Sequence, residues 1–379
     1  MKIVYCGLKN ENYNPKRGTS FEYNNFYLTL KNLPGIEVID YFFDQIKQLG
    51  KKRFNEQLLQ LIEKEKPDLI FVFMYTDEID VRTFKSLKFS AEGGSASGGK
   101  SLKFQSLNFK TLAWFSDDHW RLYNYSRFYA PHFDWVVTTY SKAPEIYSRY
   151  GIHNVIKSQW ACNNFVWQPI RLSGHPGIQS PKRDIDVSFV GQWNPARGRI
   201  INFLRKNGIN VFTRGYRWPE GKATQQEMIE ILSRSKINLN LNASVPMFSL
   251  KRLARIFLKN SNGKIVPDWH LIINIKSWWR MSVPQIKARP FEILGCRTFL
   301  ISPRADDMDN YYEDGKEVIY YDNNDDLLGK IKYWLSRDEE REKIAQAGYK
   351  RTLREHTYEM RFREVFKIIT QSVKLSGKI

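Results

Sequence analysis

The sequence predicts an α/β protein of two domains, each built on a parallel sheet with helices on both faces. Three observations lead to this prediction. The chain has 379 residues, more than a single hydrophobic core usually accommodates. Short apolar runs typical of buried strands alternate with helical patterns along most of the sequence. A stretch rich in proline, glycine and serine, 171–184, separates two such alternations and is typical of a linker.

The first alternation predicts an N-terminal Rossmann-like domain over 1–170. Its third strand, Leu69–Tyr75, is a continuous apolar run, typical of a strand buried on both faces of a parallel sheet. Segments with helical periodicity follow the first two strands. The expected strands are Lys2–Cys6, Glu37–Tyr41, Leu69–Tyr75, Thr111–Phe115, Trp135–Thr139 and Val155–Ser158, and the expected helices are Phe21–Lys31 and Phe54–Lys64.

The second alternation predicts a C-terminal Rossmann-like domain over 185–355. Sheets of this kind bind ligands beyond the carboxyl ends of their strands. The cleft between two such domains is therefore the expected site. The expected strands are Val187–Val190, Asn210–Thr213, Ile237–Leu241 and Thr298–Ile301, and the expected helices are Gly198–Asn207, Gln225–Ser235, Pro290–Gly295, Asp325–Ser336 and Asp338–Glu355.

Two stretches interrupt the alternation. Residues 91–99 (AEGGSASGG) are of low complexity and are expected to form a flexible insertion. The overlapping segment 94–101 formally matches the P-loop pattern, but no strand leads into it and no clear helix leaves it, so a loop is expected. The second stretch, 243–284, is basic, contains tryptophans and is predicted to be an insertion in the C-terminal domain.

The charge of the chain predicts an anionic partner. There are 59 Lys and Arg against 40 Asp and Glu, a formal net charge of +19. Between 243 and 290, nine basic side chains accompany one acid, Asp268. Nucleic acid, anionic lipid and phosphorylated small molecules all fit this charge. A nucleic-acid-binding protein is the weaker alternative, because the sequence has no helix-turn-helix, RNP, KH or zinc signature.

The cysteines and the apolar runs of the sequence indicate in which cellular compartment the protein is expected. Cys6, Cys162 and Cys296 suit neither a disulfide frame nor a zinc site by their spacing, and we expect buried thiols. The sequence shows neither a signal peptide nor an apolar run of the roughly 18 residues that span a bilayer. A cytoplasmic protein is therefore expected.

Candidate site residues follow strands in both domains. Asp118 and His119 come just after the strand Thr111–Phe115, where they could act as base, sugar clamp or metal ligand, or form a capped helix start with a packed ring. Asp184 and Asp186 have a spacing known from metal sites. However, they precede a strand and lie at the edge opposite the cleft, so a solvated linker end is expected.

The C-terminal domain offers candidates for binding a diphosphate. Gly191 and Gln192 end its first strand, and Arg197 opens the next helix, where backbone N–H groups and a guanidinium favour an anion. The alternative is a simple turn with surface arginines. Lys287 and Arg289 precede Glu292 at a helix start, which suits a diphosphate and ribose hydroxyls. An ordinary salt-bridged helix start fits equally well.

Several segments together resemble the CgeB-like (spore maturation protein type) glycosyltransferases of the GT-B class. This resemblance implies two Rossmann-like domains facing each other across a cleft, an acceptor held by the first domain and a nucleotide diphosphate sugar, expected to be a UDP-sugar, held by the second. It also implies a C-terminal helix in 356–379 that crosses back to the first domain, and neither metal nor other cofactor. The segments are WFSDDHWR (114–121), DWVVTTYSKA (134–143), SQWACN (158–163), DVSFVGQ (186–192), SKINLNL (235–241), QIKARPFEI (285–293) and HTYEMR (356–361).

The resemblance also implies roles for individual residues. Glu292 matches the second of two glutamates that related retaining enzymes carry, so retention of configuration is expected. The first glutamate's position holds Pro284 here, and Arg297 replaces a usual glycine. Asp118 and His119 would face the sugar or acceptor, and Arg197, Lys287 and Arg289 would stabilise the leaving diphosphate. The segment Gly215 to Trp218 is the expected wall for the base, and Asn240 and Asn242 are expected to reach the donor.

The predicted function is therefore sugar transfer from a nucleotide diphosphate sugar to a glycan, a lipid-linked molecule or a protein, in cell-surface or spore-coat glycan synthesis. A catalytically degenerate GT-B scaffold is the other alternative. The basic insertion adds a possible peripheral membrane contact, because Met247–Lys259 forms an amphipathic helix pattern and Trp269, Trp278 and Trp279 follow it. Packing of the same apolar residues on the C-terminal domain is the competing interpretation.

Overall fold

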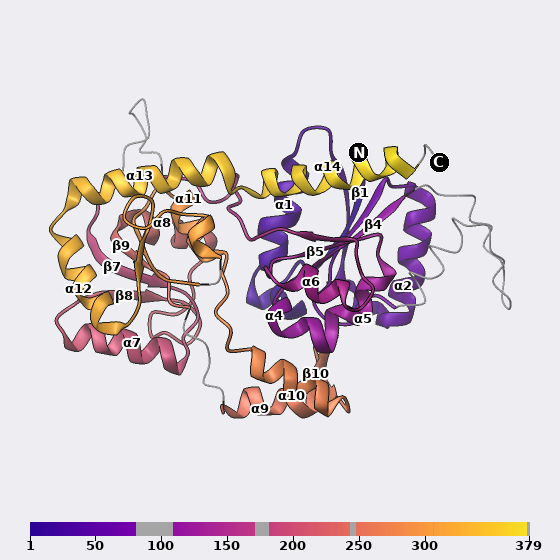
Figure 1. Ribbon diagram of the computed structural model, residues 1–379, viewed down its shortest axis with the longest axis horizontal. Helices are drawn as coiled ribbons and strands as arrows, with labels where there is room; N and C mark the ends of the chain where they lie inside the picture. Colours follow the sequence, from indigo (N-terminus) through magenta and orange to yellow (C-terminus); the bar gives the residue numbers. More distant parts are fainter. Residues whose placement is uncertain (81–108, 171–181, 243–247, 306, 377–379) are drawn as a thin grey trace. The chain divides into compact units, whose positions relative to one another are not determined.

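The computed structural model describes residues 1–80, 109–170, 182–242, 248–305 and 307–376 (Figure 1). The low-complexity segment 91–99, the P-loop-like segment 94–101 and all but the end of the expected linker lie outside these ranges. The chain divides into two compact units. Unit 1 comprises Met1–Gln159, Leu250–Met281 and Phe362–Ile379, and unit 2 comprises Trp160–Ser249 and Ser282–Arg361.

Unit 1 is built on a six-stranded parallel sheet in the order β2-β1-β3-β4-β5-β6. Every residue of β3 is buried, as the apolar run predicts. The order places β1 between β2 and β3. The chain passes from β1 to β2 on one side and then crosses to β3 on the other, so the strand order reverses at β1. The strands are β1 (Lys2–Gly7), β2 (Glu37–Phe42), β3 (Leu69–Phe73), β4 (Lys110–Phe115), β5 (Trp135–Thr138) and β6 (Val155–Lys157).

The helices of unit 1 are less regular than the sequence predicts, and one of them is longer. The expected helix Phe21–Lys31 contains a π-helical turn, whereas the second expected helix begins earlier, at Ile46, and bends at Gly50, whose φ is 73°. Short turns fill the space after β1 and β4. The elements are η1 (Glu11–Tyr13), η2 (Pro15–Arg17), η3 (Tyr23–Tyr27), α1 (Leu28–Asn32), η4 (Phe43–Gln45), α2 (Ile46–Glu65), α4 (Asp118–Arg121), η5 (Leu122–Ser126), α5 (Arg127–Tyr129), η6 (Ala130–His132) and α6 (Ala143–Ser148).

Unit 2 is built on a five-stranded parallel sheet in the order β13-β12-β9-β7-β8. Four strands lie where the sequence predicts them, shifted by at most two residues at either end. The edge strand β13, which has three residues, was not predicted. The strands are β7 (Ile185–Val190), β8 (Val211–Arg214), β9 (Ser235–Leu239), β12 (Leu300–Pro303) and β13 (Ile319–Tyr321).

Capping residues set the starts of the helices in unit 2. The Asn194 side chain accepts a hydrogen bond from the backbone N–H of Arg197, and Thr224 forms a reciprocal capping box with Glu227. These caps place the helix starts directly after the loops that leave β7 and β8. The helices are α7 (Pro195–Lys206), α8 (Gln225–Arg234), α11 (Arg289–Gly295), η7 (Met308–Asn310), α12 (Asn324–Leu335) and α13 (Asp338–Glu355).

The last helix, α14 (Tyr358–Ser376), begins in unit 2, and its residues from Phe362 onward belong to unit 1. The Phe362 ring packs edge-on against Phe26, Phe71 and Trp114 in the core of unit 1. At the start of the helix, the Tyr358 backbone N–H donates to the Cys162 carbonyl oxygen. Within the described ranges, no helix is both long and apolar enough to span a membrane.

Residues 250–281 of the basic insertion belong to unit 1, although their position in the sequence placed them in the C-terminal domain. The expected helix Met247–Lys259 is shorter, because the chain from Leu258 onward forms a hairpin that turns at Asn262 and Gly263, both with positive φ. Hydrogen bonds from this hairpin to the loop after β3 hold it on unit 1. Its elements are α9 (Leu250–Phe257), β10 (Leu258–Ser261), β11 (Lys264–Pro267) and α10 (Leu271–Arg280).

Candidate functional site

The strand order of unit 2 identifies the edge where a ligand is expected. Strand β7 lies between β8 and β9. The chain passes from β7 to β8 on one side and then crosses to β9 on the other, so the strand order reverses at β7. In open parallel sheets the crevice at such a switch point, beyond the carboxyl ends of the strands, is the usual binding site. Gly191 follows β7, Gly215 follows β8, and Asn240 follows β9. The candidate site therefore lies at this edge, within unit 2.

Two glycine loops touch each other at this edge. A Cβ atom on Gly215, whose φ is 143°, would lie 2.2 Å from the Gly191 carbonyl oxygen, so only glycine allows this approach. The indole Nε1–H of Trp218 donates to the same oxygen over 2.9 Å. Its ring is 7% exposed and packs against Phe189. The buried Trp218 side chain thus holds the two loops in place, and it does not form the expected wall for a base. The neighbouring Tyr216, by contrast, is 44% exposed.

Arg197 lies at the switch point itself. Its Nε donates to the Leu241 carbonyl oxygen after β9 over 2.9 Å, and its Nη1 donates to the Gln192 carbonyl oxygen after β7 over 2.8 Å. Burial lowers the pKa of Arg197, and the positive charge of Arg289 lowers it further. An arginine stays charged under these conditions. Two guanidinium groups from different helix starts therefore share this edge of unit 2.

The start of α11 contains the salt bridge that the sequence suggested as one of two interpretations. The Arg289 Nη1 lies 2.9 Å from the Glu292 Oε2, which is the salt-bridged helix start. Glu292 is 4% exposed, and burial raises the pKa of its carboxyl although Arg289 opposes the effect. Arg289 also lies over the Trp167 ring, 5.5 Å from its centroid. Lys287 is exposed just before the helix. The carboxylate of Glu292 can meet a ribose only if it turns away from Arg289.

The two asparagines after β9 have different surroundings. Asn240 is 4% exposed, and its Nδ2 donates to the Ser302 Oγ over 2.9 Å, which ties β9 to β12. The burial of Asn240 and its bond to Ser302 favour a structural role for this side chain. The half-buried Asn242 donates to the Gln285 carbonyl oxygen over 3.4 Å and links the end of β9 to the segment before α11.

The expected catalytic pair in unit 1 is buried. Asp118 is fully buried, and its carboxylate accepts hydrogen bonds from the Ser126 Oγ (2.6 Å) and the Tyr147 hydroxyl (3.0 Å). Burial raises the pKa of Asp118 to about 6. His119 is 5% exposed, and its ring lies edge-on to Tyr140. This burial favours the packed helix start given as the alternative over a catalytic contact with substrate.

A polar network that the sequence analysis did not single out lies at the switch point of unit 1. Glu78 is fully buried, and both its carboxylate oxygens accept from the Thr76 backbone N–H, at 2.7 and 2.8 Å. The Tyr13 hydroxyl donates to the same carboxylate. From the insertion, the Asn262 N–H donates to the Thr76 Oγ1 over 3.1 Å. The available signal was the polar run YTDE (75–78) directly after a buried strand.

The remaining candidate residues have structural roles. Asp184 pairs with Arg234 at 2.5 Å and Asp186 pairs with Lys236 at 2.7 Å, as expected for a solvated end of the linker. Across the part of the chain that the structure describes, no group of three or more His, Cys, Asp or Glu side chains is placed to hold a metal ion. The three cysteines are buried free thiols, as the sequence predicts.

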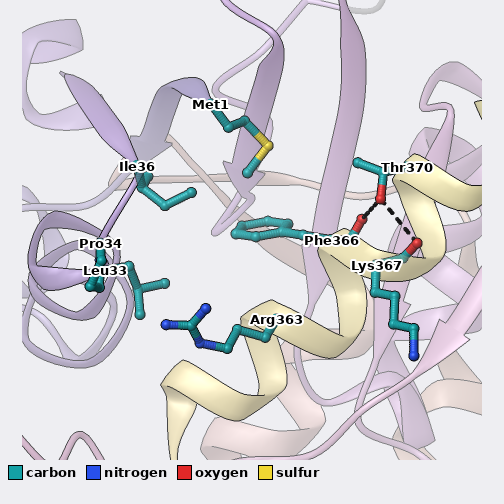
Figure 2. Close-up of a pocket in the computed structure, with 8 residues that line it drawn as sticks. All are labelled: Met1, Leu33, Pro34, Ile36, Arg363, Phe366, Lys367 and Thr370. Atoms are coloured by element: carbon teal, nitrogen blue, oxygen red, sulfur yellow. Dashed lines mark hydrogen bonds between the residues drawn. The ribbon is translucent and has the colours of Figure 1, made fainter.

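A cavity of about 400 Å³ lies in unit 1, away from both switch points (Figure 2). It opens at the amino end of β1, where Met1 stands, whereas ligands of parallel sheets gather at the carboxyl ends. Its lining is mostly apolar, with two cationic side chains from α14 beside it. The lining residues are Met1, Leu33, Pro34, Ile36, Arg363, Phe366, Lys367 and Thr370. We do not place the candidate site there.

Comparison with known proteins agrees with this architecture. Residues 197–367 match the family model described as "Glycosyl transferase-like". The structure is similar to sucrose-phosphate synthase from Thermosynechococcus elongatus (TM-score 0.58, 9% identity, 98% of this chain and 99% of that chain). It is also similar to a glycosyltransferase from Rickettsia africae (0.58, 12%, 98% and 98%) and to Anabaena HepE in complex with UDP and glucose (0.52, 9%, 98% and 100%). No curated protein matches the chain.

The fold is thus the GT-B fold of glycosyltransferases, as the sequence predicts. The family match runs from Arg197 in α7 to Lys367 in α14 and contains the candidate site apart from Gly191 and Gln192. The expected enzyme class, a glycosyltransferase, is confirmed. The matching family model is described as "Glycosyl transferase-like" and not as CgeB-like, so the CgeB-like subtype stays a prediction.

Proposed function

We propose that this protein transfers a glycosyl group from a UDP-sugar to an acceptor and holds the donor's diphosphate at the carboxyl edge of the unit 2 sheet. The observation that carries the proposal is Arg197, which joins the ends of β7 and β9 at the switch point with Arg289 close enough to lower its pKa. The complex of the similarly folded HepE with UDP and glucose supports this choice of donor.

The chemistry of the departing group explains why cations are needed there. The bond between the anomeric carbon and the terminal phosphate oxygen breaks, and UDP leaves with a growing negative charge. Arg197 and Arg289 supply charge-assisted hydrogen bonds to this diphosphate, and the exposed Lys287 adds charge at the entrance. The N-terminus of α7, a helix of 12 residues, contributes its dipole.

The nucleoside would lie against the loops after β7 and β8. We assign the exposed Tyr216 ring to contact the base, in place of Trp218, because the latter is buried beneath the loop. Glu292 would accept from the ribose hydroxyls after exchanging its contact with Arg289 for the ligand. Gly215 allows the close contact that holds these two loops together.

The finer features of the reaction are part of the same proposal. We propose retention of configuration, which the anomeric proton signals of the product would show by NMR. We propose metal-independent transfer, so turnover should persist in EDTA. The CgeB-like resemblance favours a glycan, lipid-linked or protein acceptor in cell-surface or spore-coat synthesis.

Donor hydrolysis with a panel of nucleotide sugars tests the proposal. We expect UDP-sugars to be hydrolysed in preference to GDP-, dTDP- and CMP-sugars. Arg289→Ala and Glu292→Ala should each lower turnover or donor affinity at least about tenfold, because one charge-assisted hydrogen bond is worth roughly 1.5–3 kcal/mol. Arg199→Ala and Glu230→Ala are the matched controls, since both side chains are exposed on α7 and α8.

Two outcomes would contradict the proposal. Full activity in both site variants would place the donor elsewhere. A folded wild-type protein that neither binds nor hydrolyses any nucleotide sugar would favour the degenerate scaffold.

A further inference from the structure

Helix α10 of the insertion buries two polar side chains and Trp278 against the protein, and leaves most of its other apolar side chains on the outside. Asn274 and Ser277 are 2% and 0% exposed, and the Asn124 Nδ2 donates to the Asn274 Oδ1 over 3.0 Å. Ile272 and Trp279 are 77% and 65% exposed and stand seven residues apart, on one face of the helix. A surface helix of a water-soluble protein normally has the opposite orientation.

The rest of the insertion also exposes apolar side chains. In α9, Arg252 is 6% exposed while Leu250 is 86% exposed. Trp269, between the hairpin and α10, is 84% exposed. Exposed apolar surface concentrated in one segment marks an interaction site. The exposed large apolar side chains within 250–281 are Leu250, Phe257, Leu258, Ile265, Trp269, Leu271, Ile272, Ile275 and Trp279.

This surface is also strongly basic. Residues 250–281 hold seven Lys and Arg and a single acid, Asp268, so seven minus one gives a formal charge of +6. Asp268 is itself 2.7 Å from the His270 Nδ1. The exposed cations include Lys259, Lys264 and Lys276. Apolar and tryptophan side chains mixed with lysines are the composition that anionic bilayer surfaces bind.

The insertion is fastened to unit 1 from behind. The turn of its hairpin is bound by the Asn262 N–H to Thr76 and by the Lys47 Nζ, which donates to the Asn262 carbonyl oxygen over 2.8 Å. Its helices add two cation–π contacts, Arg255 over Trp120 at 5.0 Å and Arg280 over Tyr123 at 4.6 Å. The apolar face therefore has a fixed support at the carboxyl edge of the unit 1 sheet.

We propose that the outer face of residues 250–281 docks the protein on an anionic lipid bilayer. The face supplies the apolar side chains that enter the headgroup layer, and the lysines supply attraction to acidic headgroups. A second copy of the chain fits less well, because an isologous contact would bring two patches of charge +6 together. Docking goes beyond the proposed sugar transfer, and it rests on separate residues.

Co-sedimentation with phosphatidylcholine vesicles, with and without phosphatidylglycerol, tests the proposal. We expect binding to the anionic vesicles, weaker binding at higher salt, and little binding to phosphatidylcholine alone. Lys259, Lys264 and Lys276 changed together to Gln should lower binding on the order of 100-fold, since each cation near an anionic surface contributes about fivefold. Ile272→Ser with Trp279→Ser should lower binding at least about tenfold.

Matched variants on unit 2 control for charge and apolar surface. Lys332, Lys343 and Lys350 changed to Gln remove the same charge from exposed positions of α12 and α13, and Leu353→Ser removes an exposed apolar side chain. We expect both controls to bind vesicles like the wild type. All variants should keep their affinity for UDP, so a failure of docking and a failure of the donor site are distinguishable.

Three results would overturn the proposal. The first is wild-type protein that stays in the supernatant with anionic vesicles. The second is an equal loss of binding in the control lysine variant. The third is a wild-type dimer that the Ile272/Trp279 variant converts to a monomer, with no vesicle binding by either. If that variant does not fold, quenching of the wild-type tryptophan fluorescence by brominated lipid takes its place. Trp269→Phe and Trp279→Phe should each reduce the quenching. Unchanged quenching in both is a fourth result that would overturn the proposal.

Discussion

Asp118→Asn should yield a protein that is more stable at neutral pH and keeps its transferase activity. The carboxylate of Asp118 is fully buried, and burial raises its pKa from 3.8 to about 6, although hydrogen bonds from Ser126, Thr138 and Tyr147 oppose the effect. Because Asn is uncharged and similar in shape, it can still bond the two hydroxyl groups. Asp118→Ala, by contrast, should destabilise, since it leaves the buried Ser126 and Tyr147 hydroxyls without this partner.

The magnitude follows from the pKa. Between pH 3.8 and about 6 the folded state holds a proton on Asp118 that the unfolded state has lost. Stability therefore falls as pH rises through this window. One pKa unit corresponds to about 1.4 kcal/mol, so the ionised carboxylate costs up to about 3 kcal/mol above the window. Asp118→Asn removes this cost, and its gain over wild type should be largest above about pH 7 and small near about pH 4.

Urea unfolding at several pH values measures the gain, and donor turnover measures the activity. A folded Asp118→Asn protein whose turnover drops more than about 100-fold would refute the reasoning, since it would show that the carboxylate takes part in the chemistry. An equal gain in stability at all pH values would separate the effect from ionisation and refute its cause.

Two further predictions concern unit 2. Gly215→Ala should destabilise by more than about 3 kcal/mol or prevent folding, because its Cβ would overlap the Gly191 carbonyl oxygen, whereas Gly329→Ala in α12, with open space around it, should stabilise by roughly 0.5–1 kcal/mol. Thermal unfolding of both variants compares them, and a harmless Gly215→Ala would show that the two loops do not touch. Burial lowers the pKa of His356 to about 4, so the wild type should lose up to about 3 kcal/mol as pH falls from 6.5 toward that value. His356→Gln should lack this loss in urea unfolding, and an unchanged acid slope would disprove it.

Local pattern was enough to predict most of the two sheets. The apolar run Leu69–Phe73 and the turns at Gly7 and Gly191 specify strands and their ends without reference to the rest of the chain. The edge strand Ile319–Tyr321, which has three residues, was not predicted. The helix Ile46–Glu65 was seen only in its second half, because Gly50 interrupts the pattern.

The site was harder to predict because it depends on direction and burial. Tyr216 and Trp218 are both aromatic and two residues apart, and only the bond from the indole to Gly191 shows which one is buried. Asp118 follows a strand as a catalytic residue would, but Ser126 and Tyr147 enclose it from later in the chain. For the insertion, periodicity reveals that one face of α10 is apolar, yet it does not say which face meets the protein.

The most direct test of the donor site is calorimetric titration of UDP into Arg197→Gln and Arg199→Gln proteins. The two positions lie two residues apart on α7 and face different directions. Arg197 lies at the switch point, whereas Arg199 is exposed to solvent. We predict that Arg197→Gln raises the Kd for UDP at least about tenfold and that Arg199→Gln leaves it unchanged. A folded Arg197→Gln protein that binds UDP as tightly as the wild type would contradict the assignment.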